Sequence, residues 1–447
     1  MERTLYNGLV SGVALDGKTF FYPNPLESNG QHARQEWFGV ACCPGNITRF
    51  MASVPGYIYA KRGDTLFVNL FAGGSADVDL AGGKVTVVQE TRYPWDGAVR
   101  IALTPERPRP FTVYVRIPGW AREQPVPSDL YGYADPPAPP PTVAVNGRRV
   151  PLTLLDGYVA LTRIWAPGDA IALTLPMPVR RVVAHEKVES DRNRVALQRG
   201  PIVYAAEWPD DPNGKVRNIV LPDANAMTTE FRADLLNGVS IVKGRAVGLS
   251  LDAQGAVQKA RQPFVAIPYA TWANRGRGQM AVWLARTESA ARPTPYPTLA
   301  TTSTLAHSPS SKNIRNIIDA EEPRASNDAS SYFDWWPRNG CPATQPGRPC
   351  SDGEWIEMAF AKPATVSEAQ IYWFDDTGRG GVRVPRSWRL LYKNGEAWKP
   401  VVTTAEYTTA RDGYNTVRFT PVMTSALRVE LVMQPGFSAG VQEWKVK

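Results

Sequence analysis

Apolar and polar side chains begin to alternate at a period of two at Tyr57. Segments of this kind, including 65–70, 84–90, 99–103 and 111–117, are separated by glycine, proline and aspartate. A period of two is typical of strands that are buried on one face, and closely spaced turns favour a sandwich. The 40 prolines and 36 glycines of the 447 residues suit such a turn-rich chain. The sequence therefore predicts a mainly β protein, with a β-sandwich over residues 59–287.

Helix is expected only before this change of period. Apolar residues line one side of a helix over residues 1–15, and a short strand is expected at 19–22. A second helix is predicted to begin at the vicinal pair Cys42 and Cys43, because Pro44 suits a first turn. Its apolar residues recur at helical spacing until Pro55 and Gly56.

The chain beyond the sandwich is predicted to form a separate domain. Residues 288–312 are rich in Ser, Thr, Pro and Ala without periodicity, which indicates a linker. Residues 313–447 alternate again, and the order of their strands resembles the discoidin-like jelly roll of carbohydrate-binding modules. Tyr332, Trp335 and Trp336 are the candidates there for stacking on sugars. The alternative is that these rings pack against a neighbouring domain.

The residues around the two vicinal cysteines leave two interpretations open. Unpaired N–H groups and the helix dipole at a helix N-terminus favour a thiolate, which can act as a nucleophile or bind zinc. Cysteine is also among the most frequently buried residue types, so Cys42 and Cys43 could equally be inert core residues.

A family resemblance bears on this choice. The segments FYPNPLE (21–27) and EWFGVACCPGN (36–46) resemble glycoside hydrolase family 127, the β-L-arabinofuranosidase group. The resemblance continues in order through LPMPVRR (175–181), RVALQRGPIVY (194–204) and IPYATWANRG (267–276). Members typically read GCACC where this chain has Val40 in place of the first cysteine.

The resemblance implies roles for three residues. Cys42 would be the nucleophile and a zinc ligand, Cys43 a second zinc ligand, and Tyr22 would lie near the sugar. The reaction would be a retaining hydrolysis of plant-type glycans, and the partner a carbohydrate substrate. Residues 1–58 would be the end of an (α/α)6 catalytic barrel.

The resemblance also implies that most of that barrel is missing here. In the family, a helical region before the cysteine pair supplies two more zinc ligands, a glutamate and a cysteine, and the glutamate acid/base. We therefore expect only two of four zinc ligands, and a chain that is inactive alone. The alternative is a non-catalytic carbohydrate-binding or accessory protein.

Other sites and partners are weaker candidates. The net charge of +8 comes from scattered residues, so no nucleic-acid footprint is predicted, and no apolar run is long enough for a membrane helix. The chain opens without a signal peptide.

His32 could be a substitute zinc ligand, and Glu27 with Glu36 a catalytic carboxylate pair. Cys341 and Cys350 could form a disulfide in an exported protein. Oligomeric state, localisation, the exact sugar and its linkage are not fixed by the sequence.

Overall fold

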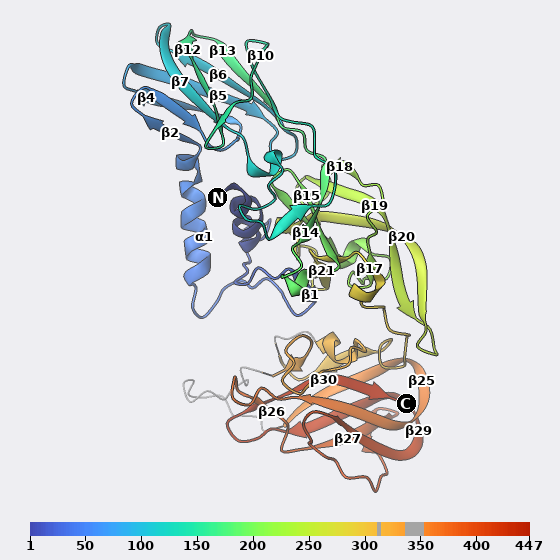
Figure 1. The fold of residues 1–447 in the computed structure, drawn as a ribbon. Coiled ribbons are helices and arrows are strands. Elements are labelled where there is room, and N and C mark those ends of the chain that lie inside the picture. Colours follow the sequence, from blue (N-terminus) through green and yellow to red (C-terminus); the bar gives the residue numbers. More distant parts are fainter. Residues whose placement is uncertain (311–313, 336–352) are drawn as a thin grey trace. The chain divides into compact units, whose positions relative to one another are not determined.

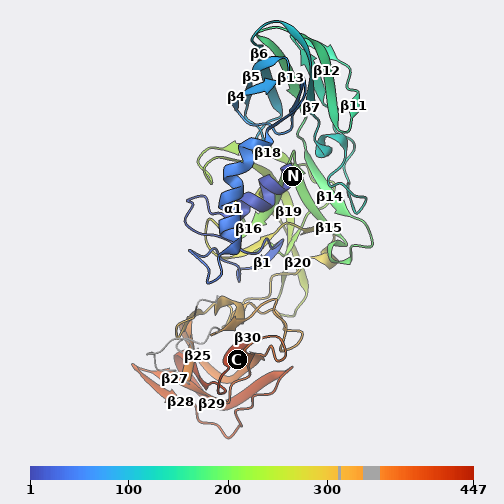
Figure 2. The same ribbon diagram turned by 90° about the vertical axis from the view of Figure 1, so that its left-hand side faces the viewer.

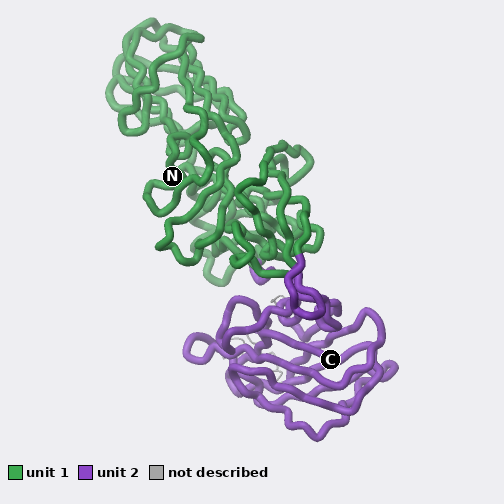
Figure 3. The backbone as a smooth tube through the Cα atoms, turned by 45° about the vertical axis from the view of Figure 1, so that its right-hand side comes forward, with its two compact units in different colours: residues 1–28, 33–249, 259–293 green, residues 29–32, 250–258, 294–447 purple. Residues whose placement is uncertain are grey.

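The computed structural model describes residues 1–310, 314–335 and 353–447. They form two compact units (Figure 3): residues 1–28, 33–249 and 259–293 make unit 1, and residues 29–32, 250–258 and 294–447 make unit 2. Strands dominate both units, which confirms the mainly β prediction (Figure 1). The only α-helix of the described residues is α1 (Cys42–Ser53), inside the range predicted for helix. No helix in the described part is long and apolar enough to span a membrane.

The first residues form less regular structure than predicted. A π-helix, η1 (Thr4–Leu9), and a 3₁₀ turn, η2 (Val10–Gly12), replace the helix expected over residues 1–15. The strand expected at 19–22 is wrong: Phe20 forms only isolated bridges, to Val13 and Gln35. Proline follows at once at positions 23 and 25, and proline cannot donate to a strand ladder. The remaining short helical turns are η3 (Val54–Tyr57), η4 (Gly119–Arg122), η5 (Glu189–Asp191), η6 (Trp208–Asp210), η7 (Tyr269–Thr271), η8 (Glu288–Ala290) and η9 (Ile314–Ile318).

Two sheets of unit 1 face each other across one core. The first has the order β10 (Arg148–Val150), β9 (Thr142–Val145), β13 (Asp169–Thr174), β6 (Ala98–Pro105), β5 (Gly83–Thr91), β4 (Gly74–Leu80). The second has the order β11 (Leu154–Leu155), β12 (Tyr158–Trp165), β7 (Arg109–Arg116), β3 (Thr65–Val68), β2 (Tyr59–Arg62). Ile101 of the first sheet and Val113 and Trp165 of the second are fully buried in the shared core. Alternate residues of each strand supply this core, as the period of two predicts.

A third and larger sheet completes unit 1. Its order is β1 (Glu27–Asn29), β21 (Gln279–Ala281), β16 (Ile202–Glu207), β20 (Val257–Pro268), β19 (Val239–Leu251), β17 (Ile219–Val220), β22 (Leu284–Ala285), β15 (Arg194–Arg199), β14 (Val179–Ala184), β8 (Tyr131–Tyr133), with β18 (Thr228–Arg232) beside β19. The Asn7 side chain ties η1 to this sheet: it donates to the carbonyl of Pro201 at 2.8 Å and accepts from the N–H of Val203 at 2.8 Å. The N-terminal segment is thereby fixed on unit 1.

The proline-rich stretch 122–142 is attached to the third sheet at several points. It contains β8, which pairs with β14. Arg180 binds the Glu123 carboxylate through two hydrogen bonds of 2.9 and 2.8 Å. Arg181 lies 3.1 Å from Asp135. Both arginines are buried, so these ion pairs fix the stretch to the sheet edge.

Unit 2 is built on one eight-stranded sheet. Its order is β24 (Phe333–Asp334), β30 (Ser438–Val446), β25 (Gly353–Phe374), β29 (Tyr414–Val432), β27 (Ser387–Asn394), β28 (Ala397–Pro400), with β23 (Thr304–His307) beside β25 and β26 (Val382–Arg383) beside β30. The ladder between β25 and β29 has register shifts at Ala359 and Val366, where the strands bend. β23 lies within residues 288–312, so part of the expected linker belongs to this sheet.

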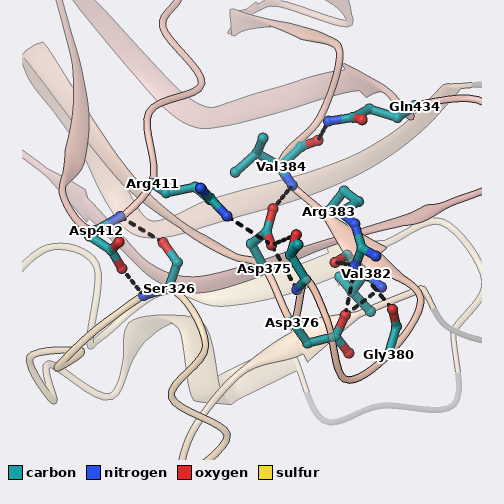
Figure 4. A network of polar contacts seen from close by, with 11 residues as sticks. Ser326, Asp375, Asp376, Gly380, Val382, Arg383, Val384, Arg411, Asp412 and Gln434 are labelled. Atoms are coloured by element: carbon teal, nitrogen blue, oxygen red, sulfur yellow. Dashed lines mark hydrogen bonds and ion pairs between the residues drawn. The ribbon is translucent and has the colours of Figure 1, made fainter.

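A polar network fixes one loop of unit 2 (Figure 4). The buried carboxylate of Asp375 accepts hydrogen bonds from the N–H groups of Thr377 and Val384, at 2.9 and 3.1 Å. Ser326 and Asp412 each donate a backbone N–H to the side chain of the other, at 2.7 and 2.8 Å. Each of these acceptors has a donor from the same unit, so the network serves to hold the loop in place.

Candidate functional site

The two vicinal cysteines lie at the first residues of α1, on one side of unit 1 (Figures 1 and 2). Ala41 is the N-cap and provides no side-chain cap, so the helix N-terminus keeps free N–H groups. Cys42 is exposed and Cys43 is half-buried, and both are free thiols. Their Sγ atoms are 3.7 Å apart. The pair is therefore accessible, and the interpretation as inert core does not hold.

Tyr22, which the resemblance implies would lie near the sugar, lies beside this pair. Its hydroxyl oxygen is 3.9 Å from Cys42 Sγ. The Tyr22 ring meets the ring of Phe38 edge to face, with centroids 4.1 Å apart. Phe38 belongs to the segment EWFG and was not singled out from the sequence; its place four residues before Cys42 was the available signal.

The three groups change one another's proton affinity. The hydrogen bonds of the Cys43 thiol and then of the Tyr22 hydroxyl lower the pKa of Cys42. The pKa of Cys43 is raised, first by its hydrogen bond with Cys42 and then by desolvation. The pKa of Tyr22 is raised, first by desolvation and then by Cys42. Cys42 is thus the thiol of the pair that ionises more readily.

The donor set fits half of a zinc site. In a tetrahedral site with zinc–sulfur bonds of about 2.3 Å, two sulfurs are about 3.8 Å apart. The observed Sγ–Sγ distance of 3.7 Å matches that value. Over residues 1–310, 314–335 and 353–447, however, no group of three or more His, Cys, Asp or Glu side chains is placed to hold a metal. Cys42 and Cys43 can supply two ligands, and this part of the chain does not supply the rest.

The weaker site candidates Glu27, Glu36 and His32 do not complete the site at the two cysteines. Glu27 forms ion pairs with Arg217 at 2.8 Å and Arg194 at 3.5 Å, a structural role. Glu36 is exposed. Burial lowers the pKa of His32, which favours its neutral form. None of the three belongs to a metal-sized cluster of the described residues.

The three aromatic candidates of unit 2 differ in what the structure shows of them. Trp335 is 1% exposed and its indole N–H donates to Ser308 Oγ at 2.9 Å, so the prediction of a sugar-stacking ring is wrong for it. Large aromatic rings are driven into the core by the area they bury. Tyr332 is half-buried and stacks on Phe374 with centroids 4.0 Å apart. Trp336, Cys341 and Cys350 lie outside the described residues.

Family models match most of unit 1. Residues 1–56 match the β-L-arabinofuranosidase GH127 catalytic domain, residues 65–177 its middle domain, and residues 179–285 the glycoside hydrolase family 127 C-terminal domain. Together these matches cover more than half of the chain.

Individual relatives agree with the family models. The chain is 37% identical, over 317 residues, to a non-reducing end β-L-arabinofuranosidase of Bifidobacterium longum subsp. longum, covering 64% of this chain and 45% of that protein. A solved GH127 β-arabinofuranosidase is 44% identical with a TM-score of 0.64, covering 66% of this chain and 46% of the other. A GH127 β-L-arabinofuranosidase from Geobacillus stearothermophilus T6 is 39% identical with a TM-score of 0.57, covering 64% and 45%.

The chain thus spans about half the length of these relatives. The matched parts follow one another along the chain, from the catalytic domain through the middle domain to the C-terminal domain. The chain belongs to glycoside hydrolase family 127.

Proposed function

We propose that this chain provides the nucleophile of a retaining β-L-arabinofuranosidase that acts on plant-type glycans. The observation that carries the proposal is the position of Cys42: an accessible thiol at the N-terminus of α1, 3.7 Å from the Cys43 thiol and 3.9 Å from the Tyr22 hydroxyl. A glycosidase nucleophile must reach the anomeric carbon, and an exposed thiolate is a strong nucleophile.

Each residue has a distinct role in this proposal. Cys42 Sγ attacks the anomeric carbon, displaces the leaving oxygen and forms a thioglycoside, which water then hydrolyses. The Tyr22 hydroxyl lies where it can hydrogen-bond both Cys42 and a sugar hydroxyl. Cys42 and Cys43 would be the thiolate ligands of a zinc ion, which would supply positive charge that stabilises the thiolate form. The protein group that protonates the leaving oxygen is not assigned to any residue here.

Because no general acid is assigned, the experiment uses a substrate whose leaving group does not need one. A positioned general acid typically contributes about 10²–10⁴-fold, but a dinitrophenyl leaving group departs without protonation. The whole chain, loaded with zinc, is incubated with dinitrophenyl β-L-arabinofuranoside, quenched, and mapped by peptide mass spectrometry. We expect one sugar on the Cys42 peptide, and none in Cys42→Ala.

Two matched variants sharpen the result. Cys43→Ser keeps Cys42 and should show slower labelling at the same peptide, together with a lower zinc content. Ser53→Ala, at the far end of α1, should match the wild type in both measurements. Labelling on a carboxylate, or equal labelling in Cys42→Ala, contradicts a cysteine nucleophile. Complete absence of labelling favours a non-catalytic carbohydrate-binding or accessory protein.

A further inference from the structure

Unit 1 contains a cavity of about 440 Å³ to which the reaction above gives no role. Three segments line it: residues 14–19 with Arg34, the turn Leu236–Asn237, and the pair Ala273–Asn274. Phe21, next to Tyr22 in sequence, stacks on Trp272 just before the third segment, with centroids 4.9 Å apart. Tyr22 instead meets Phe38 and Cys42. The adjacent side chains of Phe21 and Tyr22 thus lie in two different environments, the first beside the cavity and the second beside Cys42.

The most informative lining residue is Arg34. Its guanidinium donates to two backbone carbonyls, those of Ser11 at 2.8 Å and Trp272 at 3.1 Å, and lies 4.4 Å from the Phe21 ring centroid. Its Nε is buried without a hydrogen-bond partner, and no carboxylate of the described residues forms an ion pair with it. Desolvation lowers the pKa of Arg34 to about 10, so it stays protonated at neutral pH. Asp16 and Glu207 act on Arg34 only by longer-range Coulomb attraction, which raises its pKa. A partly desolvated cation without an ion-pair partner favours an anion in the adjoining space.

The rest of the lining suits a hydroxylated molecule rather than a bare anion. Thr19 and Asn237 bring a hydroxyl and an amide, groups that both donate and accept hydrogen bonds. The amide of Asn274 is already engaged: it accepts from the N–H of Leu15 at 2.9 Å and donates to the carbonyl of Thr271 at 2.8 Å. Leu15 and Leu236 add apolar surface. The volume lies within the range of small-molecule sites, and a few polar groups in a partly apolar cavity are typical of them.

The cavity wall also holds backbone that is unfavourable in isolation. Leu236, Asn237 and Ala273 have φ values of 50°, 63° and 57°, in the left-handed region that leucine and alanine rarely adopt. The N–H of Ala273 donates to the buried carboxylate of Glu207 at 2.6 Å, which helps to hold this conformation. Strained residues that the surrounding structure holds in place concentrate at binding sites.

We propose that this cavity binds a carboxylate-bearing sugar, a uronic acid residue. Arg34 receives the carboxylate, and Thr19 and Asn237 hydrogen-bond the ring hydroxyls. Asp16 is the acidic residue of the lining; its carboxylate accepts from the N–H of Lys18 at 3.0 Å and weakens anion binding by repulsion. Glu207, the other nearby acid, is paired with Arg275. The proposal does not rest on the arabinofuranosidase activity.

Calorimetry of the whole chain with three probes tests this site. We expect D-galacturonate to bind at least tenfold more tightly than D-galactose, which lacks the carboxylate, and than acetate, which lacks the ring. Equal affinity for galacturonate and galactose overturns the role of Arg34. Equal affinity for galacturonate and acetate shows an anion site only and overturns the assignment to a sugar.

Variants locate the binding. Asp16→Asn should tighten galacturonate binding roughly two- to tenfold by removing a like charge, whereas Asp129→Asn, the same charge change on an exposed residue of the proline-rich stretch, should not. Asn237→Gly keeps the positive φ that glycine tolerates, removes the amide, and should weaken binding. Arg34→Gln should abolish it, with a thermal melt to verify folding. If Arg34→Gln does not fold, the other two variants decide: unchanged affinity in both overturns the proposal.

Discussion

The Tyr22 hydroxyl oxygen lies 3.9 Å from Cys42 Sγ, although the two residues belong to different local structures. Tyr22 lies at a bend just before Pro23, and Cys42 opens a helix. Phe38 positions the tyrosine ring from the side. The contact joins the two motifs that define the family resemblance, and it can be tested chemically.

Tyr22→Phe should raise the pKa of the Cys42 thiol. The ring contact with Phe38 survives, but the hydroxyl that helps to lower this pKa is lost. The pH dependence of alkylation at Cys42, followed by mass spectrometry, should shift to higher pH. The matched control is Tyr57→Phe beyond the other end of α1, where the ring packs on Phe50. An unchanged profile in Tyr22→Phe would show that the contact does not operate in solution.

Glu443→Gln should stabilise unit 2 at neutral pH. Glu443 is 1% exposed, one of its carboxyl oxygens has no hydrogen-bond partner, and burial raises its pKa well above the usual range, with Asp319 adding to the effect. Because the folded state holds this proton more tightly than the unfolded state, its contribution to stability is full below the usual carboxyl pKa and is lost as pH rises through the raised value.

The gain should be roughly 1–3 kcal/mol near pH 7, the usual cost of an unsatisfied buried group, and should vanish near pH 4. Thermal melts between pH 4 and 8 measure it. Glu406→Gln, on an exposed residue, should follow the wild type throughout. A gain that is the same at every pH would refute the titration argument.

Gly97→Ala should destabilise the sandwich of unit 1. A Cβ on Gly97 would lie 1.8 Å from the carbonyl oxygen of Leu175, which is backbone and cannot move aside. Overpacking of this kind costs about 1–3 kcal/mol, occasionally more. Urea unfolding measures the loss. Gly132→Ala is the control, because nothing lies within 4 Å of its added Cβ; equal losses in both would argue against the contact.

Trp335→Ala should cost about 3–5 kcal/mol of unit 2 stability by leaving a core cavity. The ring is buried against Phe333, and Ser308 loses the donor that it accepts from. Chemical unfolding monitored by fluorescence gives the value. Leu305→Ala, at a partly buried position packed against the same core, should cost less. An unchanged free energy of unfolding in Trp335→Ala would show that the ring does not contribute to the core.

A fragment of residues 294–447 should melt at a higher temperature than one of residues 313–447. The shorter fragment lacks β23, which covers an edge of β25 through the pairing of Leu305 with Met358. Circular dichroism melts of both fragments compare them. Equal melting temperatures would mean that β23 adds nothing to the sheet.

The sequence predicted the features that depend on local pattern. The alternation around Ile101 and Val113 predicted buried strand faces, and Pro44 with the apolar repeat predicted α1 close to its observed ends. The strand at 19–22 failed because its partner would have to be supplied from elsewhere in the chain. The strand in the proline-rich stretch was missed because its pairing with β14 is a long-range contact.

The candidate site likewise combines features that the sequence indicates with contacts that only the folded structure shows. The resemblance singled out Tyr22 and Cys42 separately, but nothing in the spacing of residues indicated their contact or the contact with Phe38. Trp335 was a candidate either for stacking on a sugar or for packing against a neighbouring domain, and only the structure shows that its ring fills the core of its own unit. Arg34 looked like one more scattered basic residue until its neighbours proved to be carbonyl groups.

The two ion pairs that hold residues 122–142 have a practical consequence. A run so rich in proline would normally be the first place to choose for a fluorescent tag, a spliced peptide or a protease recognition sequence. Here Glu123 and Asp135 are fastened to Arg180 and Arg181, and Tyr133 is paired into the sheet edge. Insertions should therefore be placed in the short span between the two carboxylates, around residues 127–129. An inserted sequence can extend into solvent there while both ion pairs remain formed.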